Sequence, residues 1–295
     1  FMSYFTIMLH AVMAISRMFV VSSRGIASAN RITQILASEE DLKEIDEKKE
    51  ISSNDDDYHI RFNHVYFSYH TEPFMKDIDF GIKKGESLGI IGSTGAGKTT
   101  IINLLMRFYD VDEGSVMING KDVRGFDKIK LRRKFGVVFQ NDILFADTIY
   151  ENIDIGRNLS RKQIYEATVN AQAATFIKEK EEGLDYMLAI RASDLSGGQK
   201  QRLLISRALA GNPEILILDD SSSALDYKTD SKLRRAIDEK YPVTTSIIVA
   251  QRISSVMRLN NILVIEEGQM VGYGSHEELL ETCEVYQEIY ESQMM

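Results

Sequence analysis

The residues with the clearest chemical meaning form a glycine-rich loop that ends in a lysine and a threonine. Gly92-Ser93-Thr94-Gly95-Ala96-Gly97-Lys98-Thr99 matches the phosphate-binding pattern G-x-x-x-x-G-K-[ST] in full. The apolar run Leu88–Ile91 enters the loop and a helical pattern over Thr100–Phe108 leaves it, so the order is strand, loop and helix. Glycines let backbone N–H groups point at phosphates, and the helix N-terminus adds partial positive charge. We expect Lys98 to reach the β- and γ-phosphates of a nucleotide, Thr99 to bind Mg²⁺, and Thr100 to lie beside the phosphates.

An acidic residue at the end of a buried strand is the second candidate. Ile215-Leu216-Ile217-Leu218-Asp219 is an apolar run that closes on a carboxylate. Taken alone the pattern is weak, since many buried strands end in aspartate. After a phosphate-binding loop, it predicts a neighbouring strand whose Asp219 holds the magnesium through water.

A third pattern points to a family. Leu195-Ser196-Gly197-Gly198-Gln199 resembles the signature of ABC-type ATPases. A Gly-Gly turn that opens a helix can act as a second phosphate-binding N-terminus, and in this family it serves the ATP of a neighbouring subunit. On its own, Ser196 would also suit an ordinary helix as its N-cap. With the loop and the acidic strand in the same order, the resemblance implies an ABC-type ATPase that binds ATP and Mg²⁺.

The resemblance assigns roles to further residues between 58 and 291. It makes Tyr69 the aromatic that stacks on adenine, although a core residue of a strand would fit the same local pattern. It makes Gln140 the glutamine that senses magnesium and links to the membrane domain. Ser223-Ala224-Leu225-Asp226 matches the loop that contacts the opposite subunit.

The sequence departs from the family pattern at two catalytic positions. Active members carry a glutamate directly after the position of Asp219, whereas this chain has Asp220, which is one methylene shorter. The family's switch histidine is replaced by Gln251, which can donate a hydrogen bond to a γ-phosphate but cannot carry positive charge. Before the signature, Ala189-Ile190-Arg191-Ala192 keeps only the arginine of the Gly-Glu-Arg-Gly found in many exporters. Neutral drift could explain any one change, but two fall on the same chemical step.

The first residues have the composition of a membrane helix. Phe1–Val21 holds sixteen apolar residues, and Arg17 near its end is followed by Arg24 and Arg31, as expected where a helix enters the cytoplasm. An amphipathic core helix is the alternative, because Arg17 interrupts the apolar run. Residues 24–36 resemble the extension of the sixth transmembrane helix in exporter half-transporters, which favours a helix in the cell membrane with the nucleotide-binding domain on the cytoplasmic side.

The net charge of −9 is concentrated in one segment. Residues 39–57 contain ten acids and three lysines, a composition typical of a solvated linker. With no basic surplus elsewhere, a nucleic-acid partner is not expected. The single cysteine, Cys283, cannot form an internal disulfide and fits a reducing compartment.

These patterns predict an α/β fold in three parts. Residues 1–38 form the end of the last transmembrane helix, residues 39–57 a linker, and residues 58–295 an ABC nucleotide-binding domain. Thr148–Ile153 resembles the start of a helical subdomain that spans about residues 142–197. The remaining β-branched runs are short and apolar on both faces, which favours a mostly parallel sheet. The expected strands are His64–Tyr69, Ser87–Ile91, Val116–Ile118, Gly136–Phe139, Ile215–Leu218, Ser246–Ala250 and Ile262–Ile265.

Three functional hypotheses remain. The first is a subunit of a heterodimeric exporter whose own site is catalytically weak and whose signature completes the partner's site. The second is a homodimeric exporter with slow hydrolysis, and the third is a soluble ABC ATPase of DNA repair, chromosome structure or translation. The absence of heptads between the loop and the signature argues against the third. The exporter hypotheses imply a second half-transporter subunit and a small-molecule or peptide substrate.

Overall fold

The computed structural model describes residues 1–37, 42, 57–220 and 225–294. The chain divides into two compact units, Phe1–Lys43 and Glu44–Met295. The expected linker, residues 39–57, lies outside the described residues except for Leu42 and Asp57. Ser223 and Ala224 of the expected dimer-contact loop also lie outside them.

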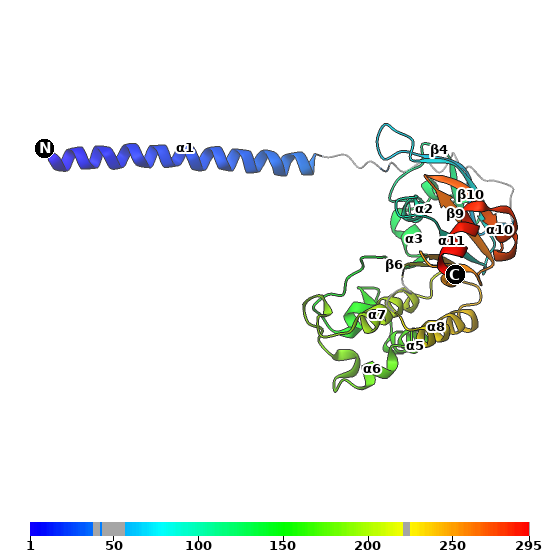
Figure 1. Cartoon of the computed structure of the whole chain (residues 1–295). Helices are drawn as coiled ribbons and strands as arrows, with labels where there is room; N and C mark the ends of the chain where they lie inside the picture. Colours follow the sequence, from blue (N-terminus) through cyan, green and yellow to red (C-terminus); the bar gives the residue numbers. More distant parts are fainter. Residues whose placement is uncertain (38–41, 43–56, 221–224, 295) are drawn as a thin grey trace. The chain divides into compact units, whose positions relative to one another are not determined.

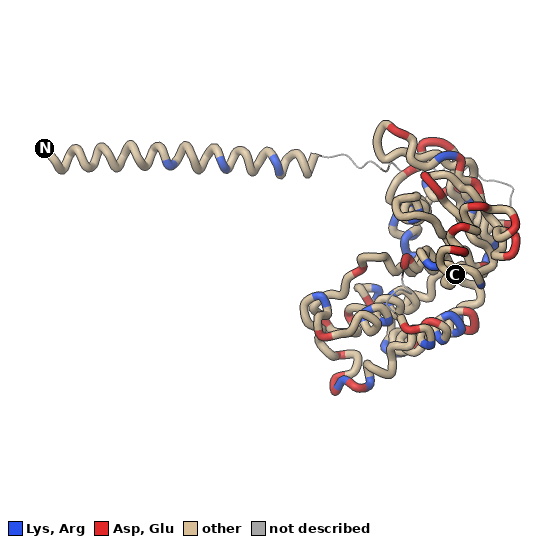
Figure 2. The backbone as a smooth tube through the Cα atoms, viewed as in Figure 1, with Lys and Arg blue, Asp and Glu red and all other residues tan. Residues whose placement is uncertain are grey.

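The first unit is dominated by one helix, α1 (Met2–Leu36), none of whose residues is buried. It is 35 residues long and contains an 18-residue window with a mean hydropathy of 1.7, so by length and composition it is sufficient to cross a membrane. It contains no acidic residue, and its charged residues Arg17, Arg24 and Arg31 are the blue positions of the helix in Figure 2. Because these arginines recur at every seventh residue, two helical turns apart, they lie on one face of α1.

The second unit is built on a sheet of ten strands in the order β5-β4-β1-β2-β10-β9-β3-β8-β7-β6. The end of this sheet that carries β3 is parallel, and its strands are runs of Ile, Leu and Val buried on both faces. Parallel pairing brings the carboxyl ends of β3, β7 and β8 to one edge. The strands of this half are β3 (Ser87–Ile91), β6 (Phe135–Val138), β7 (Ile215–Asp219), β8 (Thr245–Val249) and β9 (Asn261–Glu266).

The other half of the sheet is largely antiparallel, so the expectation of a mostly parallel sheet is wrong there. Among the described strands, β1 pairs antiparallel with β2 and β4, β4 with β5, and β9 with β10. The expected strand His64–Tyr69 begins and ends earlier, because Ile60 and Phe62 already pair with both neighbours. The strands are β1 (Ile60–Phe67), β2 (Met75–Ile82), β4 (Glu113–Ile118), β5 (Lys121–Asp122) and β10 (Gln269–Gly274).

The helices of this unit fall into two groups. In Figure 1, α5, α6, α7 and α8 gather at the end of the unit away from β4, β9 and β10, whereas α10 and α11 lie beside β9 and β10. The helices are α2 (Lys98–Leu105), α3 (Lys128–Arg132), α4 (Ile149–Asp154), α5 (Arg161–Asn170), α6 (Ala174–Lys178), α7 (Gly197–Ala210), α8 (Tyr227–Lys240), α9 (Ile253–Val256), α10 (His276–Thr282) and α11 (Glu284–Met294), with 3₁₀ turns η2 (Val123–Gly125), η3 (Gly183–Asp185) and η4 (Ile190–Ala192).

Three buried apolar clusters hold these layers together. One packs α2 against the strands of both halves of the sheet, and the second packs α4 to α8 against β6 and β7. The third joins α9, α10 and α11 to β9 through Ile253, Leu279 and Tyr286. The elements around the carboxyl edge of β3, β7 and β8 therefore rest on closed apolar cores, which makes that edge a rigid platform.

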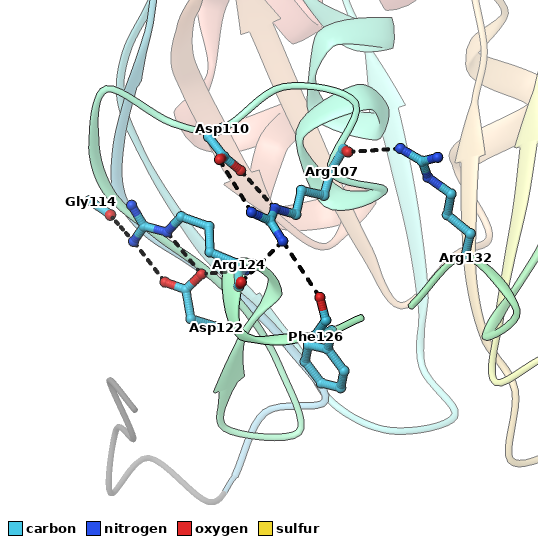
Figure 3. Close-up of polar contacts among 7 residues, drawn as sticks. All are labelled: Arg107, Asp110, Gly114, Asp122, Arg124, Phe126 and Arg132. Atoms are coloured by element: carbon cyan, nitrogen blue, oxygen red, sulfur yellow. Dashed lines mark hydrogen bonds and ion pairs between the residues drawn. The ribbon is translucent and has the colours of Figure 1, made fainter. Parts of the chain in front are cut away.

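An arginine network joins the antiparallel half of the sheet to this platform. The fully buried Arg107, just after α2, donates from Nε to Asp110 Oδ1 at 2.9 Å and from Nη1 to Arg124 O at 3.0 Å. Arg132, the last residue of α3, donates from Nη2 to Arg107 O at 3.2 Å. Figure 3 shows these contacts converging on Arg107. Since α3 leads into β6 and then to Gln140, the network ties α2 to that segment.

Candidate nucleotide-binding site

The glycine-rich loop connects β3 to α2 in the expected order. It turns sharply because Gly92 and Gly97 adopt φ angles of 155° and 111°. A Cβ atom on Gly92 would lie 2.0 Å from Ile265 O, so the backbone of β9 leaves no room for a side chain there. At Gly97 a Cβ would meet Met75 Sδ at 2.7 Å in addition to the strained φ. The loop shape therefore depends on glycine at both positions.

Lys98, the first residue of α2, folds back over the loop. Its Nζ donates to Gly92 O and to Ser93 O, both at 2.8 Å. Burial lowers the pKa of Lys98, and the nearby carboxylates of Asp219 and Asp220 oppose this shift. A partly desolvated ammonium group inside a ring of backbone dipoles is suited to an anion with several oxygens, such as a phosphate chain.

Oxygen ligands for a divalent cation lie beside the lysine. Thr99 donates from Oγ1 to Asp219 Oδ2 at 3.4 Å, and Gln140 lines the same cavity. Burial raises the pKa of Asp219, while the hydrogen bond from Thr99 counteracts the rise. One carboxylate, one hydroxyl and one amide fit Mg²⁺, which takes few protein ligands and completes its shell with water and phosphate oxygens. The described residues hold no cluster of His, Cys, Asp and Glu that would suit a tighter metal cage.

Tyr69 lies just beyond the end of β1 and is 40% exposed, so it is not a core residue of the strand. Its hydroxyl shares a hydrogen bond of 3.0 Å with Thr100 Oγ1 in α2. Phe67 and Tyr109 pack edge-on against the Tyr69 ring, with their ring centroids 4.8 Å and 5.2 Å from its own. The ring is thereby held at the mouth of the loop, where it can stack on a base.

A cavity of about 280 Å³ brings most of the expected residues together. Gly92, Ser93 and Ala96 shape the loop without lining this cavity, and Phe74, Val249 and Ala250 line it although the sequence did not single them out. Val249 and Ala250 could have been found as the residues before Gln251, whereas Phe74 carries no comparable signal. The lining residues are Tyr69, Phe74, Thr94, Gly95, Gly97, Lys98, Thr99, Thr100, Gln140, Asp219, Asp220, Val249, Ala250 and Gln251.

The two unusual residues of the cavity face each other. Gln251 donates from Nε2 to Asp220 Oδ2 at 3.4 Å. Asp220 follows β7 with a left-handed backbone, at φ 48°, and its N–H donates to Val249 O at 2.9 Å. Both side chains therefore stand at the carboxyl edge of the sheet, on the side of the cavity formed by β7 and β8.

The signature residues lie outside this cavity. Ser196 is the N-cap of α7: its side chain accepts from Gln199 N at 3.3 Å, and Gln199 Oε1 accepts from Ser196 N at 2.9 Å. The ordinary capping role considered for Ser196 is therefore present. A Cβ atom on Gly197 would have no heavy atom within 4 Å, so its face of the turn is open, and Gly198 follows it in α7. Asp226 caps α8 through Thr229 and does not line the cavity either.

The comparison with known proteins gives this arrangement a family. The sequence pattern of the family described as ABC transporter matches residues 75–223, which include the glycine-rich loop, Gln140, the signature and β7. The chain belongs to the ABC transporter family. The second unit is accordingly an ABC nucleotide-binding domain, whose α/β fold and ATP-binding role follow from that membership.

Two ABC relatives resemble the chain over most or all of its length. It is 39% identical to the ATP-dependent lipid A-core flippase of Desulfotalea psychrophila over 99% of the chain and 52% of the flippase. It is 41% identical to a Staphylococcus aureus protein, provisionally named a multidrug export ATP-binding/permease protein, over 79% of the chain and 41% of that protein. The chain thus spans about half the length of the curated relatives it matches.

A solved structure agrees with the fold as well. The structure of a bacterial Atm1-family ABC exporter with ATP bound aligns with a TM-score of 0.84 and 31% identity, covering 92% of this chain and 48% of the exporter chain. The ABC nucleotide-binding fold preceded by a long helix is therefore confirmed. The roles of the individual site residues remain predictions that rest on the geometry described above.

Proposed function

We propose that this chain is the ATP-binding subunit of a membrane exporter whose own site hydrolyses ATP slowly and whose signature serves a partner subunit. The proposal rests on one observation: the residues with a role in the family lie in two separate places in this chain. Lys98, Thr99 and Asp219 share one cavity with Asp220 and Gln251, whereas the signature turn lies outside it.

Binding of MgATP follows from the residues of the cavity. Lys98 neutralises the β- and γ-phosphates, the loop N–H groups bind their oxygens, and Tyr69 stacks on the adenine. Thr99, Asp219 and Gln140 would hold the magnesium. Mg²⁺ held there would neutralise negative charge on the phosphate oxygens.

The signature supports a composite site across a dimer. The N-terminus of α7 begins in the open Gly197-Gly198 turn, so its backbone N–H groups and partial positive charge are available to an anion from another chain. A γ-phosphate held in the partner's loop matches this requirement. In this arrangement each ATP lies between one subunit's loop and the other subunit's signature, and Asp226 faces the opposite subunit.

Hydrolysis requires a water molecule aligned on the γ-phosphorus. Asp220 would orient this water, but its shorter side chain displaces the carboxylate, and a shift of about 1 Å can lower a rate on the order of 100-fold. Gln251 can donate to the γ-phosphate but supplies no positive charge as the phosphoryl group leaves. The working site of the complex is therefore the one that this chain completes through Ser196, Gly197 and Gly198.

Export is supported by α1 and by the names of the relatives. The helix is long and apolar enough to cross a membrane, and the flippase and the multidrug export protein are membrane transporters by name. Closure of the dimer on ATP would then drive outward movement of a small-molecule or peptide substrate. The partner is a second half-transporter, which we propose to be a different chain with Glu and His at the positions of Asp220 and Gln251.

The deciding experiment combines nucleotide binding with purification from membranes. Lys98→Ala should abolish ATP binding at this site, whereas Lys84→Ala, which removes an exposed lysine outside the cavity, should leave it unchanged. Binding at micromolar ATP that survives Lys98→Ala would exclude the cavity as the nucleotide site. Co-purification of the full-length subunit with a second ABC half-transporter would support the heterodimer, and recovery of this subunit alone would support a homodimer.

A further inference from the structure

The loop that carries Gln251 is held by a residue at the far end of the sequence. Gln293, in the last turn of α11, donates from Nε2 to Gln251 O at 2.8 Å. Its Oε1 accepts from Ile253 N, also at 2.8 Å. The Gln293 side chain therefore bonds to the backbone on both sides of Arg252, although Gln251 lies 42 residues earlier in the sequence. This pair of hydrogen bonds is called the clasp.

The two partners fix the orientation of the amide. A backbone carbonyl only accepts and a backbone N–H only donates, so the Gln293 amide satisfies both in one of its two flipped orientations. Gln251 O lies in the turn between β8 and α9, and Ile253 N belongs to the first residue of α9; both lie beyond the last paired residue of the strand. Among side chains of this length, an amide alone offers a donor and an acceptor together at neutral pH.

The helix that carries Gln293 is held in place by a buried apolar cluster. Tyr286 of α11 is fully buried in the apolar cluster that also contains Ile253, and its hydroxyl contacts His276 Nδ1 at 2.8 Å. The helix that carries Gln293 and the helix that follows Gln251 thus share one core. Gln293 itself does not line the nucleotide cavity, so its influence on a ligand there passes through the loop.

We propose that Gln293 is a positioning residue for the γ-phosphate contact of Gln251. This inference rests on the proposed function, in which Gln251 donates to the γ-phosphate of bound ATP. Because the clasp holds the backbone at Gln251 O and Ile253 N, the side chain of Gln251 extends from a fixed backbone position and contacts Asp220. Loss of the clasp frees the loop and weakens the contact that distinguishes ATP from ADP.

The test compares the affinities of this site for ATP and ADP. It uses the full-length subunit in its complex, with the equivalent of Lys98→Ala in the partner so that only this site binds. Gln293→Met keeps the length of the side chain and removes both hydrogen bonds. We expect the preference for ATP over ADP to fall about fivefold, the effect of one ordinary hydrogen bond, with ADP affinity unchanged.

A matched control lies on the same helix. Gln287 donates from Nε2 to Leu280 O and does not touch the Gln251 loop, so Gln287→Met should leave the preference for ATP unaltered. If Gln293→Met leaves the ATP preference unchanged, or if it lowers the affinities for ATP and ADP equally, the positioning role is wrong. If Lys98→Ala fails to abolish binding, the proposed function fails instead, so the two failures are distinguishable.

A conservative variant adds a second readout. In Gln293→Glu, an ionised carboxylate cannot donate to Gln251 O, but a protonated one can donate there and still accept from Ile253 N. Relative to the native protein at the same pH, the ATP preference of this variant should be low at pH 8 and recover as the pH falls toward about 5. A preference that stays equally low across this range would overturn the proposal.

Discussion

The amide of Gln251 donates to the carboxylate of Asp220 across 3.4 Å, so the two residues expected at catalytic positions that differ from the ABC pattern contact each other. They follow the ends of the neighbouring parallel strands β7 and β8, and both line the cavity that contains Lys98. In the proposed function, an uncharged donor beside a shortened carboxylate would weaken a single step, the attack of water on the γ-phosphate, so the two residues would act together at one site.

The first prediction concerns this pair. Asp220→Asn should change the total ATPase activity of the complex little, because in the proposed function its site already hydrolyses ATP slowly. The double variant Asp220→Glu with Gln251→His should instead raise hydrolysis at this site by about tenfold or more. It restores the longer carboxylate side chain at the first position and a side chain that can carry positive charge at the second. Asp220→Asn is measured as steady-state ATPase activity of the complex with the native partner, and the double variant is measured with the partner's loop lysine replaced, so that only this site hydrolyses ATP. If Asp220→Asn removes most of the total activity, this chain does not hold the weak site.

The second prediction separates the capping role of Ser196 from its role toward a phosphate. Ser160 forms the same capping box with Gln163 at the start of α5, far along the sequence from the signature, and serves as the control. Ser196→Asp and Ser160→Asp should both keep a capped helix, because aspartate is a good N-cap. Only Ser196→Asp should nearly abolish ATPase activity, since its negative charge would repel the γ-phosphate of the partner's ATP. Equal activities of the two variants, each folded by circular dichroism, would contradict a ligand role for the signature.

Tyr69 provides the third prediction. Stacking of an aromatic side chain on a base contributes about 1–3 kcal/mol, so Tyr69→Ala should weaken ATP binding roughly tenfold or more. Tyr69→Phe keeps the ring but loses the hydrogen bond to Thr100, and we expect nearly native affinity. Tyr165→Ala, at a tyrosine of α5 that is equally exposed at 40%, is the control and should have no effect. Isothermal titration with MgATP checks all three; the assignment fails if Tyr69→Ala binds as tightly as Tyr69→Phe.

The fourth prediction is a pH dependence of stability with opposite signs at two histidines. Burial lowers the pKa of His59 below its ordinary value of 6.5, so the unfolded chain binds more protons just below pH 6.5. His59 therefore destabilises the fold as the pH falls from about 7 toward 5. The hydrogen bond to Asp77 raises the pKa of His64. The stability that protonated His64 adds to the fold is therefore complete below pH 6.5 and is lost as the pH rises through the raised pKa.

Urea unfolding from pH 5 to pH 8 tests this difference. His59→Gln should flatten the loss of stability on the acidic side, because the buried ring no longer takes up a proton. His64→Gln should lower the stability on the acidic side of the pH profile and leave the stability on the basic side unchanged. If both variants shift the pH profile in the same direction, the environments described for the two rings are incorrect.

Local patterns explain why the core of the site was predictable. The loop from Gly92 to Thr99 is specified by its own glycines, and Asp219 by the apolar strand before it. Strand β2 was missed because Lys76, Asp77 and Asp79 interrupt its apolar residues, whereas Phe80–Ile82 at its end are all buried. An interrupted strand gives a weaker sequence signal than a continuous apolar run.

Contacts between distant segments could not be predicted in the same way. The hydrogen bond between Tyr69 and Thr100 depends on where β1 ends relative to α2, which the sequence near Tyr69 does not specify. The clasp of Gln293 on the Gln251 loop depends on the docking of α11 against α9. An exposed glutamine near the end of a helix carries no local mark of such a contact, since most exposed glutamines contact only water.

The buried Arg107 determines how this part of the domain can open. Its guanidinium bonds to Asp110 and to the carbonyl of Arg124, and its own carbonyl is bound by Arg132. If one of these segments frayed alone, it would leave a buried charge without its partners, which costs several kcal/mol. The stretch from Arg107 to Arg132 should consequently unfold as a single unit, and its amide hydrogens should exchange with solvent at a common, slow rate rather than loop by loop.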